Sequence, residues 1–221
     1  MGISDLCETG SGSRIDKFTQ NVKLFRMTER QHQILEAAID VFARYGVRKA
    51  TMGDLAEQAG ISRQTLYARY ANKDEIMNAA MRLITDKVVG QVRAAWLEAG
   101  SISEKLDIFL DLAIVRFFEQ IKQMPDSIDL LTGYGEGGPA AQHAAEAGKI
   151  DLLRGLFEPC KDKLVANGTS PQDLAEFFYQ GSASFKFTAG DLEHLKALLA
   201  TLKRTTLLMH TIRWISANPF A

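Results

Sequence analysis

Residues 51–78 constrain the fold of this chain most, because they predict two short helices around a tight turn and a third helix directly after them. Ala56 and Gly60 lie four residues apart in this stretch. Four apolar residues surround this pair: Leu55, Ala59, Ile61 and Leu66. In a helix-turn-helix, a small alanine lets the two helices approach closely and a glycine adopts the positive φ of the turn. Ser62 can then N-cap the second helix.

The start of that second helix carries side chains that suit the recognition of base edges. In a helix-turn-helix, the N-terminal residues of the second helix contact the major groove. Arg63 suits guanine, Gln64 suits adenine, and Thr65 can touch a thymine methyl group or a phosphate. A pair of polar residues at a helix start is usually just exposed to solvent. Within this motif, however, we expect Arg63 and Gln64 to contact bases.

Three further residues are placed to hold the DNA backbone. Thr51 opens the first short helix, where a hydroxyl and backbone N–H groups can meet a phosphate, and a plain N-cap is its other possible role. Tyr67 can offer its hydroxyl to a phosphate, and Lys73 can add a charge-assisted contact. The predicted DNA contacts therefore come from six residues: Thr51, Arg63, Gln64, Thr65, Tyr67 and Lys73.

The stretch from Ile34 to Lys73 resembles the TetR family of bacterial transcriptional regulators. The matching residues are Ile34–Ala38, Phe42, Gly46, Thr51–Ala56, Ala59–Arg63, Thr65–Tyr67, Tyr70 and Lys73. The Leu-Tyr-x-x-aromatic-x-x-Lys tail sets this match apart from an ordinary helix-turn-helix, and Tyr70 is assigned to packing. Arg69 stands where the family usually has histidine, Ala68 where it often has an aromatic, and Gly53 at a position near DNA in some members. These departures concern the operator sequence rather than DNA binding.

The charge of the chain does not by itself indicate a nucleic-acid partner. The formal net charge is −1, and residues 28–78 hold seven basic and seven acidic residues. Only the local field at the contact face matters for phosphate contacts, so the motif outweighs the average.

Composition indicates a globular protein of the cytoplasm. The chain is 46% apolar and 24% charged, and it has no run of apolar residues long enough to span a bilayer. Its first residues lack the pattern of a secretory signal, and Cys7 and Cys160 are too few and too far apart for a disulfide framework or a metal cluster. We expect a cytoplasmic protein located on the bacterial nucleoid.

The pattern along the chain predicts an all-α fold with three parts. Residues 1–27 form an N-terminal extension, residues 28–74 a three-helix DNA-binding domain with the helix-turn-helix, and residues 75–221 a larger helical domain for ligand binding and dimerisation. Apolar residues at helical spacing within 15–25 favour an extra helix in the extension. Met27 as the natural start is the alternative, because Thr28 and Gln31 make a capping box.

Helical patterns cover most of the chain. We expect helices at 29–45, ended by Gly46, at 72–99 with Asn72 as the cap, and at 104–123. A glycine-rich segment follows at 132–139, and further helices are expected at 140–166, 172–188 and 191–216. Strand-like alternation and internal repeats are absent from the sequence.

The resemblance implies that the C-terminal part holds a ligand pocket and a dimer interface. The aromatic residues together permit an apolar pocket for a small apolar or aromatic ligand, although plain core is the more common role of any single one of them. The pocket residues we predict are Trp96, Phe109, Phe117, Tyr134, Phe157 and Phe178. Small residues between aromatics and a broad apolar face on the last helix favour a dimeric four-helix bundle, and a tight crossing within one chain would explain the small residues as well. The predicted interface residues are Phe177, Gly181, Ser184, Leu195, Leu199 and Leu202.

The sequence offers no catalytic, metal or cofactor site. His32, His143, His194 and His210 are scattered, and none belongs to a His-Glu-x-x-His pattern. The glycines at 133–138 lack the strand before and the Gly-Lys-Ser/Thr after that a phosphate loop needs. We therefore expect neither an enzyme nor a bound cofactor.

Together these features predict a homodimeric repressor that binds double-stranded operator DNA and is released by a small molecule. A DNA-binding regulator without such an inducer is the second hypothesis. An all-helical enzyme with an unrecognised site is the third. A footprint on the intergenic DNA upstream of its gene would exclude the enzyme, and the volume of a pocket would separate the first two.

Overall fold

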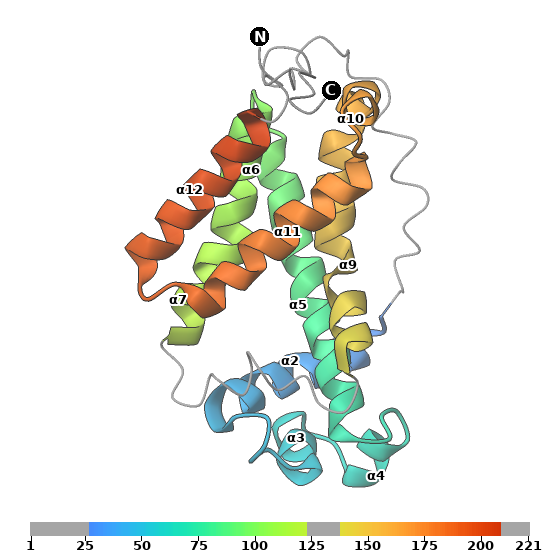
Figure 1. The fold of residues 1–221 in the computed structure, drawn as a ribbon. Coiled ribbons are helices and arrows are strands. Elements are labelled where there is room, and N and C mark those ends of the chain that lie inside the picture. The colour runs from blue at the N-terminus through green and yellow to red at the C-terminus, as the bar shows by residue number, and fades with distance from the viewer. Residues whose placement is uncertain (1–26, 123–137, 209–221) are drawn as a thin grey trace. The chain divides into compact units, whose positions relative to one another are not determined.

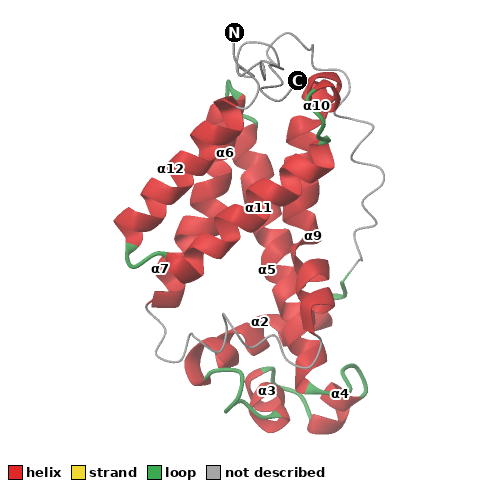
Figure 2. Ribbon diagram, in the orientation of Figure 1, coloured by secondary structure: helices red, strands yellow, loops and turns green. Residues whose placement is uncertain are grey.

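The structure is a computed structural model that describes residues 27–122 and 138–208. In those ranges the chain forms helices joined by loops and no strand (Figure 2). This confirms the predicted all-α fold. The predicted helix at 15–25, the pocket residue Tyr134 and most of the glycine-rich segment lie outside the described residues.

The helices follow the predicted order, and Figure 1 shows their arrangement along the chain. Their bounds are α2 Glu29–Tyr45, α3 Met52–Gln58, α4 Arg63–Tyr67, α5 Lys73–Trp96, α6 Ile102–Leu110, the π-helical turn η2 Asp111–Val115, α7 Arg116–Lys122, α9 Gly138–Phe157, the 3₁₀ turn η3 Glu158–Cys160, α10 Lys161–Ala166, α11 Pro171–Thr188 and α12 Leu192–Leu208.

Capping boxes set where several helices begin. The predicted box of α2 is present: Thr28 accepts from the backbone N–H of Gln31, whose side chain accepts from the backbone of Thr28. The same reciprocal pairs open α3, α6 and α11, with Ser170 capping α11 before its first residue, Pro171. Each box satisfies two backbone donors that a helix start otherwise leaves unpaired.

The helix predicted at 104–123 is interrupted by the π-helical turn η2. The backbone N–H of Arg116 donates to the carbonyl of Asp111, five residues back. The three consecutive residues Ala113, Ile114 and Val115 are all buried there. A π-helical turn adds one residue to a helix, and it interrupts the α-helix that the sequence pattern predicts as continuous.

Two compact units divide the described chain. The head unit contains residues 27–91, 117–122 and 138–149, and the second unit contains residues 92–116 and 150–208. α5 and α9 each contribute residues to both units. The sequence-based division between residues 74 and 75 separates a DNA-binding domain from a ligand-binding and dimerisation domain. That division by function stays a prediction.

The core of the head unit ties the helix-turn-helix to α2 and α5. Phe42 from α2, Leu55 from α3, Leu66 from α4 and Ile76 from α5 are each at most 1% exposed and belong to one apolar cluster. Figure 1 shows α3 and α4 beside the first turns of α5. Because every helix of the motif buries a large side chain in this cluster, the cluster fixes α4 as a rigid element.

The core of the second unit is built around aromatic rings. Phe178 of α11 lies 6.3 Å from the ring of Phe109 in α6 and 6.4 Å from the ring of Phe157 in α9, measured between ring centroids. Tyr179 meets the ring of Phe109 edge-on at 6.5 Å. α12 packs on α11 and α6 and buries Leu195 fully.

Candidate nucleic-acid interface

The turn of the helix-turn-helix has the predicted geometry. Gly60 has a φ of 63°, which glycine adopts without strain. Ala56 is buried, and its carbonyl accepts a hydrogen bond from the backbone N–H of Ile61 at 2.9 Å. The sequence-based assignment of Gly60 to the positive-φ position is therefore confirmed.

α4 is capped at its start and anchored on one face. The hydroxyl of Ser62 accepts from the backbone N–H of Thr65 at 3.1 Å, which confirms Ser62 as the N-cap. Leu66 faces the head core, whereas Arg63 and Gln64 are exposed and Tyr67 is 53% exposed. A short, capped helix therefore presents the side chains of Arg63, Gln64 and Tyr67 to solvent, and their contacts with DNA stay a prediction.

Thr51 opens α3 as an N-cap and lies beside the same surface. Its backbone N–H and its hydroxyl both donate to the carboxylate of Asp54 at 2.8 Å, and the hydroxyl accepts from the backbone N–H of Asp54 at 3.2 Å. The hydrogen bonds from Thr51 hold the pKa of the Asp54 carboxyl below its usual range, and the nearby positive charge of Arg63 lowers it further. The capping role of Thr51 is confirmed, and its phosphate contact stays a prediction.

Lys73 makes contacts that sequence analysis missed. Its ammonium donates to the backbone carbonyls of Arg48 at 3.2 Å and of Ala50 at 3.0 Å, in the loop between α2 and α3. Lys73 therefore fastens the start of α5 to the loop that leads into α3. An ammonium carries three donors, so one N–H is left beyond these two contacts for a phosphate.

Tyr70 packs as the sequence analysis assigned it. Its ring lies against the head core, together with Ala59 and Ile61, and it is half-buried. Burial raises the pKa of the Tyr70 hydroxyl, and the positive charges of Arg69 and Arg82 partly offset this increase.

The predicted pocket residues are mostly packed rather than arranged around a space. Phe109, Phe157 and Phe178 are fully buried against one another. Trp96 is half-buried, and its indole N–H donates to the carbonyl of Lys105 at 2.7 Å. Phe117, also half-buried, belongs to the head unit. The pocket stays a prediction.

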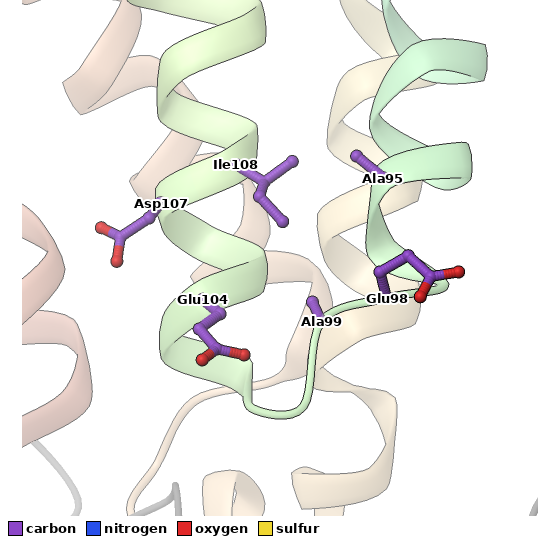
Figure 3. A pocket seen from close by; sticks show the side chains of 6 residues that line it. All are labelled: Ala95, Glu98, Ala99, Glu104, Asp107 and Ile108. Atoms are coloured by element: carbon purple, nitrogen blue, oxygen red, sulfur yellow. The ribbon is translucent and has the colours of Figure 1, made fainter.

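A small hollow lies instead between the end of α5 and the start of α6. Its volume is about 340 Å³, and its lining residues are Ala95, Glu98, Ala99, Glu104, Asp107 and Ile108 (Figure 3). Two of its acids are engaged: Glu104 accepts from the backbone N–H of Gly100 at 2.8 Å, and Asp107 pairs with Lys203 at 2.6 Å. This acidic lining differs from the apolar pocket that the sequence predicts.

The predicted interface residues fall into two groups. Leu195, Leu199 and Leu202 are buried within the chain, and Leu202 packs next to Gly181. Phe177 is 54% exposed, and Ser184 of the same helix is exposed. α11 therefore keeps an exposed side that α12 does not cover, and the interface itself stays a prediction.

The described residues hold neither a cluster of metal ligands nor a membrane-spanning helix. No group of three or more histidine, cysteine or acidic side chains is placed to hold a metal ion there. No helix in those ranges is long and apolar enough to cross a bilayer.

Comparison with known proteins agrees with this geometry, which is that of a helix-turn-helix DNA-binding protein. Residues 34–87 match the family model of bacterial regulatory proteins, tetR family. The uncharacterized HTH-type transcriptional regulator YezE of Bacillus subtilis is 32% identical over 180 residues, which cover 74% of this chain and 89% of that protein. The chain belongs to the TetR family of bacterial transcriptional regulators.

Other relatives match over a smaller share of their length or in fold alone. The probable acrEF/envCD operon repressor of Escherichia coli is 35% identical over 157 residues, 66% of this chain and 59% of the repressor. The chain thus spans less than two thirds of the first curated relatives that it matches. The structure of FadR from Thermus thermophilus, a TetR-family repressor in complex with lauroyl-CoA, has a TM-score of 0.61 at 18% identity and covers 85% of this chain and 98% of that one.

Proposed function

We propose that this TetR-family regulator is a homodimeric repressor that binds a near-palindromic operator and leaves it when a small molecule binds. The observation that carries the proposal is the capped α4, with Leu66 fixed in the core and Arg63, Gln64 and Tyr67 exposed. Two such helices, one from each subunit, would enter successive major grooves roughly 34–36 Å apart. The protein would act on the nucleoid in the cytoplasm.

The operator can be found without knowing the regulated genes. Duplexes from the intergenic DNA upstream of the gene are titrated in fluorescence anisotropy, and the bound region is footprinted. Gln64→Ala should reduce discrimination at specific base pairs by about 1–3 kcal/mol and leave non-specific affinity unchanged. A wild-type protein that binds every duplex equally at physiological salt would contradict sequence-specific regulation.

The exposed side of α11 supports the dimer. Phe177 and Phe187 are each more than half exposed on this helix, which is unusual for two phenylalanines in one element. A second copy of α11 would cover them. Light scattering should give the mass of two chains, and Phe177→Glu should shift the protein to the monomer. Gln91→Glu at an exposed site on α5 is the control, because it adds the same charge away from α11.

The inducer is proposed to bind in the second unit. An inducer can release the operator only if it prefers one conformation of the dimer. That conformation must be the one in which the spacing of the two DNA-binding heads does not fit the operator. The rings of Phe109, Phe157 and Phe178 are packed together, so a ligand there must separate them. Because the Thermus thermophilus FadR structure holds lauroyl-CoA, acyl-CoA thioesters are the first compounds to test. An inducer should weaken operator affinity, and operator DNA should weaken inducer binding by the same factor.

A regulator without a small-molecule inducer is the second candidate. The closed packing of the aromatic rings is the observation that favours it. If no compound that binds the protein changes its operator affinity, this second candidate replaces ligand-released repression. The relatives named above are transcriptional regulators rather than enzymes.

A further inference from the structure

The side chain of Arg63 does not extend freely from α4. Its guanidinium lies against Gly53 in the first turn of α3. A Cβ on residue 53 would stand 2.4 Å from Nη2, 2.9 Å from Cζ and 3.0 Å from Nε of Arg63. The guanidinium therefore occupies the space that any side chain at position 53 would take.

This contact sets Gly53 apart from other glycines in the helices of the chain. Gly90 and Gly155 stand in helices with open space where a side chain would be, and the nearest atom to a Cβ on Gly148 is 3.4 Å away. Glycine is also less favourable than alanine within a helix. The geometry offers a reason for glycine at position 53 that Gly90 and Gly155 lack, which is room for the side chain of Arg63.

A negative charge also lies near the guanidinium of Arg63. Asp54, the next residue along α3, is kept ionised by its hydrogen bonds from Thr51. The positive charge of Arg63 adds to this effect on the pKa of Asp54. Arg63 thus has an open surface at Gly53 and a negative charge beside it, both on α3.

Resting on the proposed function, we infer that Gly53 is a specificity-determining residue, because it sets the position from which the Arg63 guanidinium meets the operator. A side chain at position 53 would push against the far end of a flexible side chain and not against backbone. It would therefore move Arg63 and leave the fold intact. Gly53 acts through Arg63 and is a positioning residue.

The test measures base preference rather than affinity alone. The wild-type protein selects duplexes from a randomised double-stranded DNA library. The best duplex and all its single-base-pair variants are then titrated in fluorescence anisotropy. The proteins compared are wild type, Gly53→Ala, Arg63→Ala, the double variant, and Gly90→Ala. Gly90→Ala is the matched control, because it makes the same change on an exposed helical site with nothing nearby.

We expect Gly53→Ala to reduce discrimination at the base pairs that Arg63→Ala identifies, by roughly fivefold or more, since a good bidentate contact discriminates by roughly 5- to 150-fold. In the Arg63→Ala background, Gly53→Ala should change nothing further. Gly90→Ala should keep the wild-type preference. The melting temperature of Gly53→Ala should equal or exceed that of the wild type, because alanine favours the helix.

Several results would overturn the inference. The first is a Gly53→Ala protein with every base preference unchanged. The second is an effect of Gly53→Ala that is equally strong in the Arg63→Ala background, because residue 53 would then contact the DNA directly. A Gly53→Ala protein that fails to fold would show that the Cβ displaces backbone, and it would equally refute the role assigned here. If the wild-type protein selects no sequence at all, the proposed function itself fails, and this result is distinct from the others.

Discussion

Replacing Lys73 by methionine separates its structural role from its predicted role at the DNA. Methionine keeps an apolar side chain of similar length and removes the ammonium, which donates to the carbonyls of Arg48 and Ala50. One of these hydrogen bonds is exposed and the other partly buried. Hydrogen bonds from charged groups contribute up to about 3 kcal/mol when buried, and about 1 kcal/mol each is reasonable here because water can replace the donor.

A second effect acts in the opposite direction. Lys73 is the first residue of α5, where a positive charge is unfavourable to the helix dipole by about 0.3–1 kcal/mol. Its removal recovers part of the lost stability. We therefore expect Lys73→Met to lower the free energy of unfolding by about 1–1.7 kcal/mol. Urea unfolding at one fixed protein concentration measures this difference, since dimerisation would make stability depend on concentration.

The same variant tests the phosphate contact. If the remaining N–H meets a phosphate, Lys73→Met weakens binding to all duplexes alike and reduces the slope of log K against log salt by about 0.9. Lys196→Met is the control, because it removes the same charge from an exposed site on α12. An unchanged salt slope would remove Lys73 from the DNA contacts. An unchanged free energy of unfolding would refute the structural role.

Three other measurements test particular features. Gly60→Ala forces a side chain onto a φ of 63° and should lower the free energy of unfolding by about 1–2 kcal/mol in urea titrations, whereas Gly90→Ala should not be destabilising. The folded-state pKa of Asp54 lies below its usual 3.8, so its stabilising effect should be complete above about pH 5 and lost as the pH falls through the folded-state value. The stability difference between wild type and Asp54→Asn should therefore shrink on acidification, and a constant difference would refute this assignment. In a Trp214→Phe protein, Trp96 is the one remaining tryptophan. An inducer that binds near the end of α5 should therefore change the fluorescence of Trp96. Release of the operator without such a change would place the ligand elsewhere.

The features that the sequence predicted correctly are local ones. The capping box of Thr28, the N-cap Ser62 and the positive φ of Gly60 each depend on residues within a few positions of one another. Helix ends and tight turns are decided at that range, so residue types and spacing suffice to place them.

The features that it missed depend on contacts between distant residues. Lys73 reaches a carbonyl 25 residues earlier in the chain, and nothing in the pattern around it marks that contact. The guanidinium of Arg63 lies on Gly53, which belongs to another helix, and residue spacing alone does not give that contact. Phe109, Phe157 and Phe178 are aromatic whether they line a space or fill it, so composition cannot separate a pocket from a packed core.

The repeated capping boxes also bear on how fast the chain folds. Each box at the start of α2, α3, α6 and α11 closes within four residues, so it forms without any long-range contact. Helix nucleation is the unfavourable step of helix formation, and a cap that satisfies two donors at once reduces its cost. Helices that begin at sites specified in this way can form in about a microsecond, before the cores assemble. The slow step in refolding should then be the docking of preformed helices rather than their formation.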